Sequence, residues 1–457
     1  MHHAFHVIQR LFVICFVLAA IGILLSGGWL AGLCVIAAAG WMVRGRITIR
    51  HFTLWLLIGG LLLRVAILLV LHPPIISDFG LMFGAAQSLL AGDTSFQYEL
   101  YFSLWAYQSV FIAWQAMFLA VWNNPLVLKF VGALLSTGTV CLLYRLVRDH
   151  VHESAAQAAM LLLTAFPFVL TLPTVLTNQI ASAFFLALGV WLVACQDCTR
   201  LGFWRFPLAG LALQAGNLLR SEGIILVVAV LAYAVFTVLR RPETFKRILC
   251  GMAALLVVYG AVSVGADAAV RTSGLNENGT ANGYPAWKFL TGLNFDTEGG
   301  YSQSDWNQLA PTFDETGHST DATYQMQNEL LSERLSAGPK ALLLHAVHKC
   351  KLLWCDDALN WAFGHLQLHD WLTLIYNNIR QMDRLLFYAA LLLTAFGLYR
   401  PCRTPAAYLP LFVVFAAFCA FLLIEVQPRY AYLPQLFLFC GASLGLDRLL
   451  GKEKNHA

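Results

Sequence analysis

The stretch Phe52–Leu71, FTLWLLIGGLLLRVAILLVL, decides the fold class of this chain. It is long enough to cross the hydrocarbon core of a bilayer as a helix, which takes about 20 apolar residues. Runs of this kind recur from Leu11 to Leu446, and the 457 residues are 59% apolar or aromatic but only 12% charged, about half the charge of a soluble chain. The sequence therefore predicts an all-α polytopic membrane protein.

The apolar runs predict about twelve membrane spans, the shorter ones crossing with the help of flanking residues that reach toward the interface. The first run follows one arginine and precedes no small-residue cleavage site, so we interpret it as an uncleaved span and not as a signal peptide. The predicted spans are Leu11–Leu25, Trp29–Val43, Phe52–Leu71, Pro125–Val147, Ala155–Leu172, Gln179–Cys195, Phe206–Leu219, Ile224–Leu239, Ile248–Val270, Arg384–Leu398, Ala406–Ile424 and Tyr430–Leu446.

The segment Ser103–Trp122 is also long enough to cross, and the distribution of positive charge decides how it lies. If it lies flat at the membrane surface, the basic clusters of the short loops all face one side. If it crosses, every cluster after the first moves to the other side. Because cytoplasmic loops are enriched in Lys and Arg, we predict an interfacial helix in a plasma-membrane protein with both termini cytoplasmic. The clusters include Arg44/Arg46/Arg50, Arg145/Arg148, Arg200/Arg205, Arg240/Arg241/Lys246/Arg247 and Arg400/Arg403.

This topology leaves two long regions on the extracytoplasmic face, residues 72–124 and 271–383, hereafter the first and second loop regions. The first contains two predicted juxtamembrane helices, and the second is the most polar part of the chain. We expect one membrane domain over residues 1–457. The net charge of +4 is small and dispersed, which gives no indication of a nucleic-acid partner.

Asp78 is the first acidic residue of the first loop region and follows two prolines that end the preceding span. One interpretation is a helix N-cap, in which the carboxylate accepts backbone N–H bonds. The other is a general base that takes a proton from an incoming hydroxyl at the membrane face. The two interpretations are compatible, because a cap also fixes where the carboxylate points.

Further charged residues lie at the same ends of other spans. Each is a candidate anchor or a turn-stabilising ion pair; together with Asp78 they suggest a phosphate-bearing ligand, since guanidinium groups suit phosphate oxygens. Arg64 lies inside a span, about two turns below its outer end, where a charge must reach the interface, pair, or serve a site. The candidate binding residues are Arg64, Arg220, Glu222, Lys288, Glu425, Arg429 and Tyr430.

No motif of a nucleotide-binding loop, a catalytic triad or a zinc protease is present. Nucleoside triphosphates are scarce outside the cytoplasm, so a phosphate-bearing donor on that face should be lipid-linked. No convergent set of histidines, cysteines and carboxylates stands out, so a divalent metal is doubtful.

The order of these features resembles the GT-C superfamily of polyprenyl-phosphate-sugar glycosyltransferases, specifically family 39, which contains protein O-mannosyltransferases and aminoarabinose transferases. The resemblance rests on Asp78, on the helices Phe79–Leu90 and Ser103–Trp122, on the turn Asn217–Gly223 and on the turn Glu425–Tyr430. It implies a GT-C-like fold with Asp78 as the catalytic base and the outer arginines as ligands of the lipid phosphate.

This chain departs from the family pattern at two positions. Many relatives have a second acidic residue beside the first, where Phe79 stands here, and another in the second outer turn, where Thr174–Gln179 contains only Asn178. A metal site built from those carboxylates is therefore doubtful, and Asn178 is instead a candidate hydrogen-bond partner for sugar or phosphate.

We expect an inverting transfer of one sugar from a polyprenyl-phosphate donor to a hydroxyl of a glycan, lipid or protein acceptor, without a soluble cofactor. A transporter or flippase of a lipid-linked or polar substrate is the main alternative, although the charges collect at span ends rather than at mid-membrane. A polysaccharide polymerase or ligase, with a polyprenyl-diphosphate oligosaccharide as donor, is the other.

Overall fold

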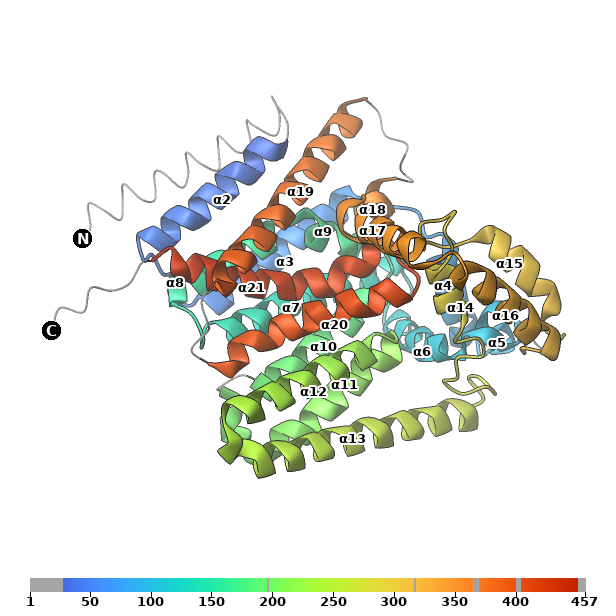
Figure 1. Cartoon of the computed structure of the whole chain (residues 1–457). Helices are drawn as coiled ribbons and strands as arrows, with labels where there is room; N and C mark the ends of the chain where they lie inside the picture. The colour runs from blue at the N-terminus through green and yellow to red at the C-terminus, as the bar shows by residue number, and fades with distance from the viewer. Residues whose placement is uncertain are drawn as a thin grey trace.

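The computed structural model describes residues 28–194, 197–315, 318–364, 366, 370–399 and 404–450. The predicted first span, Leu11–Leu25, lies outside the described residues. Within them the regular structure is helical, apart from one isolated bridge between Phe313 and Ser319. Long helices pack side by side as a bundle, and the short helices of both loop regions gather at one end of it (Figure 1). The all-α prediction is confirmed.

Six segments are long and apolar enough to cross a membrane, or seven if a bent helix pair counts as one span. The predicted number of about twelve is not confirmed: the predicted spans Phe206–Leu219 and Tyr430–Leu446, for example, correspond to helices of only 15 and 17 residues. At 1.5 Å per residue these rise only about 23–26 Å, less than the roughly 30 Å hydrocarbon core. They are α11 (Arg205–Leu219) and α21 (Tyr432–Arg448), whereas α2 (Gly28–Arg44) and α10 (Gln179–Ala194) each border residues outside the described ranges.

The six segments include almost all of the stretch Phe52–Leu71, and α7 begins and ends at the predicted residues Pro125 and Val147. They are Phe52–Val70 (α3), Pro125–Val147 (α7), Gly223–Arg240 (α12), Pro242–Thr272 (the turn η5, Pro242–Thr244, with α13, Phe245–Thr272), Leu372–Leu398 (within α19, Asp370–Leu398) and Pro405–Leu423 (the turn η7, Pro405–Tyr408, with α20, Leu409–Leu423).

The bent pair is α8 (Glu153–Ala165) followed by Pro167–Thr174, which comprises α9 (Pro167–Thr171) and η3 (Leu172–Thr174), with a bend of 60°. Pro167 lacks the N–H that would continue the helix. An Oδ1 atom of Asp383 accepts the N–H of Phe168 at 2.8 Å and so caps the new helix start. The bend directs the chain into the segment that carries Asn178.

The first loop region contains α4 (Ser77–Leu90), η1 (Ser95–Tyr98), α5 (Leu100–Leu104), η2 (Ala106–Gln108) and α6 (Ser109–Leu119). The single helix predicted over Ser103–Trp122 is therefore wrong in detail. Trp105 adopts φ −119° and ψ 54°, which ends α5 and separates it from the next turn. The remaining helix α6 has 11 residues, about 16 Å, and is too short to cross a bilayer.

The second loop region forms α14 (Trp287–Gly292), α15 (Gln303–Leu309), η6 (Ala310–Thr312), α16 (Asp321–Leu335), α17 (Pro339–Cys355) and α18 (Asn360–Phe363). Helix α19 begins at Asp370, well before the predicted span start at Arg384. A small apolar cluster of Leu104, Tyr284, Trp287, Leu290 and Leu309 joins the two loop regions. The N–H of Gly283 also donates to the carbonyl of Leu104 at 2.6 Å. The two loop regions therefore form one layer beside the bundle end.

Candidate functional site

A cavity of about 690 Å³ lies where the two loop regions meet the ends of the long helices. This volume is within the range of about 300–1,000 Å³ typical of small-molecule sites. Every predicted site residue except Arg64 lines it: Asp78, Asn178, Arg220, Glu222, Lys288, Glu425, Arg429 and Tyr430. Residues from five separate parts of the chain therefore come together.

Asp78 is in the first turn of α4, but it is not the N-cap, because Ile76 holds that position and no side chain caps the helix. The N-cap interpretation is therefore wrong. The residue before it, Ser77, has φ +58°, a left-handed conformation that costs about 1–2 kcal/mol for a residue with a Cβ. The Asp78 side chain is 46% exposed, and its Oδ2 lies 3.9 Å from Nη2 of Arg429.

The guanidinium group of Arg429 makes cation–π contacts with two aromatic rings. Its guanidinium carbon lies 4.8 Å from the ring centre of Phe79 and 4.7 Å from that of Trp361. Its Nε donates to Oε1 of Gln427 at 2.8 Å, and its backbone carbonyl accepts a bond from Nε2 of Gln179 at 2.7 Å. Cation–π contacts strengthen when water is excluded, so this guanidinium is oriented before any ligand arrives.

Lys288 and Glu425 form a closer ion pair, with Nζ 2.7 Å from Oε2. Oε1 of the carboxylate also accepts from Gln427 Nε2 at 2.8 Å and from the Tyr430 hydroxyl at 3.1 Å. Burial would raise the pKa of Glu425, but the charge of Lys288 and these hydrogen bonds lower it overall. Burial would likewise lower the pKa of Lys288, and the charge of Glu425 raises it instead. Both groups are therefore held ionised.

Arg220 ends α11 in an extended conformation and pairs through Nε with Glu222. Its Nη1 donates to Oδ1 of Asn178 at 3.1 Å, and the Asn178 amide in turn donates to the carbonyl of Leu219 at 3.0 Å. Burial acts to lower the pKa of Arg220, but Glu222 and then Tyr430 raise it overall. Asn178, singled out where relatives are acidic, is thus a hydrogen-bond partner of an arginine.

The Tyr430 ring lies at the centre of the cationic groups. The Arg220 and Arg429 guanidinium carbons are 4.9 and 5.5 Å from its centre, and Lys288 Nζ is 5.6 Å away. Each of these cations also has a carboxylate neighbour, so the three positive and three negative groups balance. The expected cluster of phosphate-binding cations is therefore a cluster of ion pairs, in which the Asp78–Arg429 contact is the longest.

Arg64 does not line the cavity. It is 1% exposed within α3, and it donates from Nε to Ser136 Oγ at 3.0 Å and from Nη1 to the Gly60 carbonyl at 3.1 Å. These hydrogen-bond partners are neutral groups of the bundle, and its Nη2 is buried without a hydrogen-bond partner among the described residues. Arg64 is therefore buried within the helix bundle, away from the other candidate residues.

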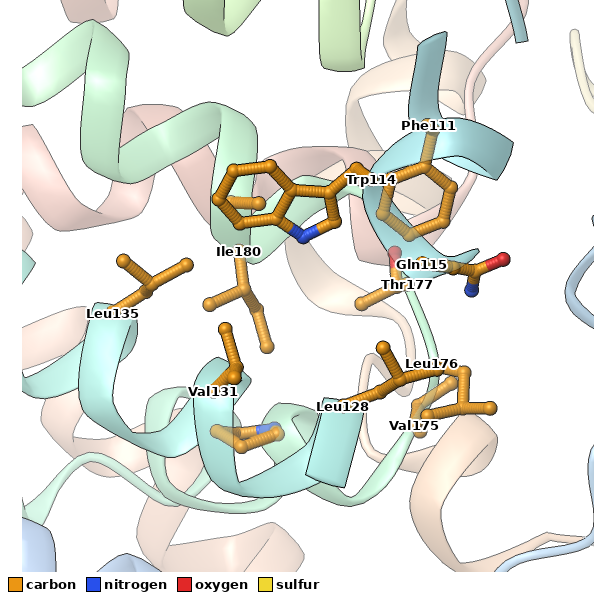
Figure 2. Close-up of a pocket in the computed structure, with 13 residues that line it drawn as sticks. Phe111, Trp114, Gln115, Leu128, Val131, Leu135, Val175, Leu176, Thr177 and Ile180 are labelled. Carbon is orange, nitrogen blue, oxygen red and sulfur yellow. The ribbon is translucent and has the colours of Figure 1, made fainter. Parts of the chain in front are cut away.

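A second cavity lies between α6, α7 and α10, where Trp114, Val131, Leu135 and Ile180 face one another (Figure 2). Its volume is about 30 Å³, enough for about one water molecule and too small for a sugar. Among the described residues, no group of three or more histidine, cysteine or acidic side chains is placed to hold a metal ion.

Sequence reasoning missed one buried cation beside the site. Lys349 of α17 is 1% exposed and donates from Nζ to the carbonyls of Leu422 and Ile424, both at 2.9 Å. These carbonyls end α20 directly before Glu425, and helix ends need such partners. Burial lowers the pKa of Lys349 to about 8. The available signal was Lys349 inside a mainly apolar helix that also contains Lys351.

Sequence reasoning also missed the aromatic side of the cavity. It is lined by Tyr101, Trp105, Tyr107, Trp287, Tyr301, Trp306 and Trp361. Apart from Tyr101 and Trp105, which are one helical turn apart, these residues follow no helical or strand periodicity, so the main signal in the sequence was the position of Trp287 next to Lys288.

Residues 108–264 match the family model described as dolichyl-phosphate-mannose-protein mannosyltransferase. The matched part contains Asn178, Arg220 and Glu222, whereas Asp78, Lys288 and the turn Glu425–Tyr430 lie outside it. Comparison with curated protein sequences gives no match.

Two solved structures are similar at 14% identity over 87% of this chain. One is the apo oligosaccharyltransferase of Archaeoglobus fulgidus, with a TM-score of 0.45 and 50% of that chain covered, so this chain spans half its length. The other is ArnT from Cupriavidus metallidurans bound to undecaprenyl phosphate, with a TM-score of 0.39 and 76% of that chain covered. By its family-model match, this chain is similar to the glycosyltransferases of the GT-C superfamily, which confirms the resemblance noted in its sequence.

Proposed function

We propose that this chain transfers one sugar, with inversion, from a polyprenyl-phosphate donor to a hydroxyl group on the extracytoplasmic face of the plasma membrane. The observation that carries the proposal is the cavity in which the Asp78 carboxylate lies 3.9 Å from the oriented Arg429 guanidinium. The family-model match supports glycosyl transfer as the reaction class. In this proposal residues 1–457 form one membrane domain, and both loop regions face outward.

Asp78 is the proposed base, because its carboxylate is about half exposed and so reachable by an acceptor. The acceptor O–H gives its proton to this carboxylate while its oxygen bonds to the anomeric carbon of the donor sugar. The bond from that carbon to the phosphate oxygen breaks, and the electron pair leaves with the polyprenyl phosphate. Attack opposite the leaving group inverts the anomeric configuration.

Arg429 is the proposed partner of the departing phosphate, since charge-assisted hydrogen bonds from a fixed guanidinium stabilise developing negative charge. Its contact with Asp78 is long, so a phosphate competes for the guanidinium at little cost. Arg220 is proposed to assist from across the Tyr430 ring. Asn178 and Glu222 orient Arg220, and Glu425 and Tyr430 orient Lys288. A role for Arg64 toward the phosphate stays a prediction.

The test is reconstitution of the full chain in liposomes with undecaprenyl phosphate carrying radiolabelled mannose, glucose or aminoarabinose. We expect donor cleavage, with release of undecaprenyl phosphate and transfer of label to a hydroxyl compound or to water. A label that crosses the bilayer on an intact donor would instead identify a transporter or flippase. Turnover of only a polyprenyl-diphosphate oligosaccharide would identify a polymerase or ligase.

A further inference from the structure

The proposed reaction assigns no role to the aromatic side of the cavity. Five aromatic residues, Tyr101, Trp105, Trp287, Tyr301 and Trp306, form what we call the aromatic wall. Adjacent rings are in contact along it: the Tyr101 and Trp105 centres are 5.0 Å apart, those of Trp105 and Trp306 5.8 Å, and those of Trp306 and Trp287 5.6 Å. Tyr301 continues the series 6.1 Å from Trp287. Trp287 is 2% exposed and supports the other rings from behind, so the part of the wall that a ligand can reach is formed by Tyr101, Trp105, Tyr301 and Trp306.

The wall also offers hydrogen-bond donors. Trp105 and Trp306 are partly buried, and their indole N–H groups donate no bond to the described residues. Tyr301 is 48% exposed and donates from its hydroxyl to Oε1 of Gln303 at 3.1 Å, and Gln303 lines the same cavity. Indole groups at binding surfaces usually find a polar partner. A ligand with several acceptor oxygens would supply it here.

The position of the wall separates it from the bundle. Trp287 begins α14, Trp306 lies in α15, and Tyr101 lies in α5; these helices gather beyond the end of α20 (Figure 1). Asp78 lies in the first turn of α4, and Arg429 lies in η8 (Pro428–Ala431), directly before α21 in the bundle. A lipid-linked donor must approach from the bundle side, because its tail stays in the bilayer. The wall is thus placed for the second substrate.

We propose that the acceptor is a carbohydrate, whose sugar ring stacks on the aromatic wall and presents its hydroxyl to Asp78. This inference rests on the proposed function. A pyranose ring has an apolar C–H face that packs on aromatic rings and a rim of hydroxyl oxygens that accept indole N–H bonds. The cavity volume of about 690 Å³ is in the range of small-molecule sites and so leaves room for an acceptor sugar beside the donor sugar.

The experiment measures tryptophan fluorescence of the full chain in detergent during titration with cellobiose, maltose and mannobiose, and separately with a hexapeptide containing Ser and Thr. We expect saturable quenching by at least one disaccharide and none by the peptide. Trp306→Ala should weaken that binding at least tenfold. Trp306→Phe, which keeps a ring but removes the N–H, should weaken it less. Trp204→Ala is the matched control, because Trp204 is 71% exposed and does not line the cavity.

The inference is overturned if only the peptide quenches the fluorescence or if no disaccharide does. It is also overturned if Trp306→Ala binds the disaccharide with unchanged affinity. The Trp306→Phe variant keeps the test informative if the alanine variant does not fold. Binding requires no donor, so the two proposals fail separately. Donor cleavage without disaccharide binding overturns the acceptor assignment alone, whereas disaccharide binding without cleavage of any donor contradicts the proposed function.

Discussion

Two ion pairs in the cavity tie the turn Glu425–Tyr430 to different parts of the chain, and they differ in closeness and exposure. In the Lys288–Glu425 pair the atoms are 2.7 Å apart and the carboxylate side chain is 2% exposed. In the Arg429–Asp78 pair they are 3.9 Å apart and the carboxylate side chain is 46% exposed. The first carboxylate has neighbouring protein donors for both oxygens, whereas the second faces the cavity. The close pair therefore fixes the turn, and the open pair stays accessible to a substrate.

The largest expected effect comes from the open pair. Asp78→Asn should reduce glycosyl transfer by about a hundred- to ten-thousandfold, the contribution typical of a general base, because the amide cannot take the acceptor proton. Transfer of label in the reconstituted system measures this loss. Asp93→Asn is the control, since that exposed carboxylate of the first loop region bonds only Ser95 and does not line the cavity. Near-normal turnover of Asp78→Asn would contradict the assignment of the base.

The close pair should affect stability more than chemistry. Glu425→Gln leaves Lys288 without its counter-charge and should lower the free energy of unfolding by roughly 2 kcal/mol. This is below the about 3–5 kcal/mol of a fully buried pair, because the Lys288 side chain is 37% exposed. Thermal unfolding in detergent at pH 7 measures the difference, with the exposed Glu329→Gln as the control.

The same variant has a defined pH dependence. The folded pKa of Glu425 lies below its usual value of 4.5, so the carboxylate stabilises the fold above that pH. This contribution is lost as the pH falls through the folded pKa. The stability difference between wild type and Glu425→Gln should therefore be full at pH 7 and shrink progressively below pH 4.5. A difference that stays constant in acid would show that the pair contributes little through its charge.

The smallest expected effect concerns the backbone that carries Asp78. Ser77→Gly should raise the free energy of unfolding by about 0.5 kcal/mol, because glycine removes the left-handed strain at φ +58° but costs unfolded-state entropy. Ser88→Gly, inside the same helix, should instead lower it by about 0.5–1 kcal/mol. Thermal unfolding of both variants checks the opposite signs. Equal destabilisation would mean that the backbone at Ser77 is unstrained in solution.

Much of the bundle was predictable, since long apolar runs specify helices by local composition, and α7 matches its predicted range Pro125–Val147. The charged residues of the cavity were also found, because they lie at the same ends of apolar runs and a bundle brings such ends together. The number of spans was not predictable from composition alone, as the break at Pro167 shows. The pair Arg220–Glu222 lies within one turn and was open to prediction. The pairs Lys288–Glu425 and Arg429–Asp78 join segments far apart in the sequence, for which no periodic signal exists.

The position of the turn Glu425–Tyr430 in the sequence decides when the site can assemble during synthesis of the chain. The N–H groups of Glu425 and Val426 donate to the carbonyls of Lys288 and Gly299, and Gln179 holds the carbonyl of Arg429. Asp78 is therefore synthesised long before its partner Arg429. A chain interrupted before Glu425 contains the base, the loop lysine and the wall, yet lacks the turn that draws them together. Activity should therefore arise only after the turn Glu425–Tyr430 has been synthesised.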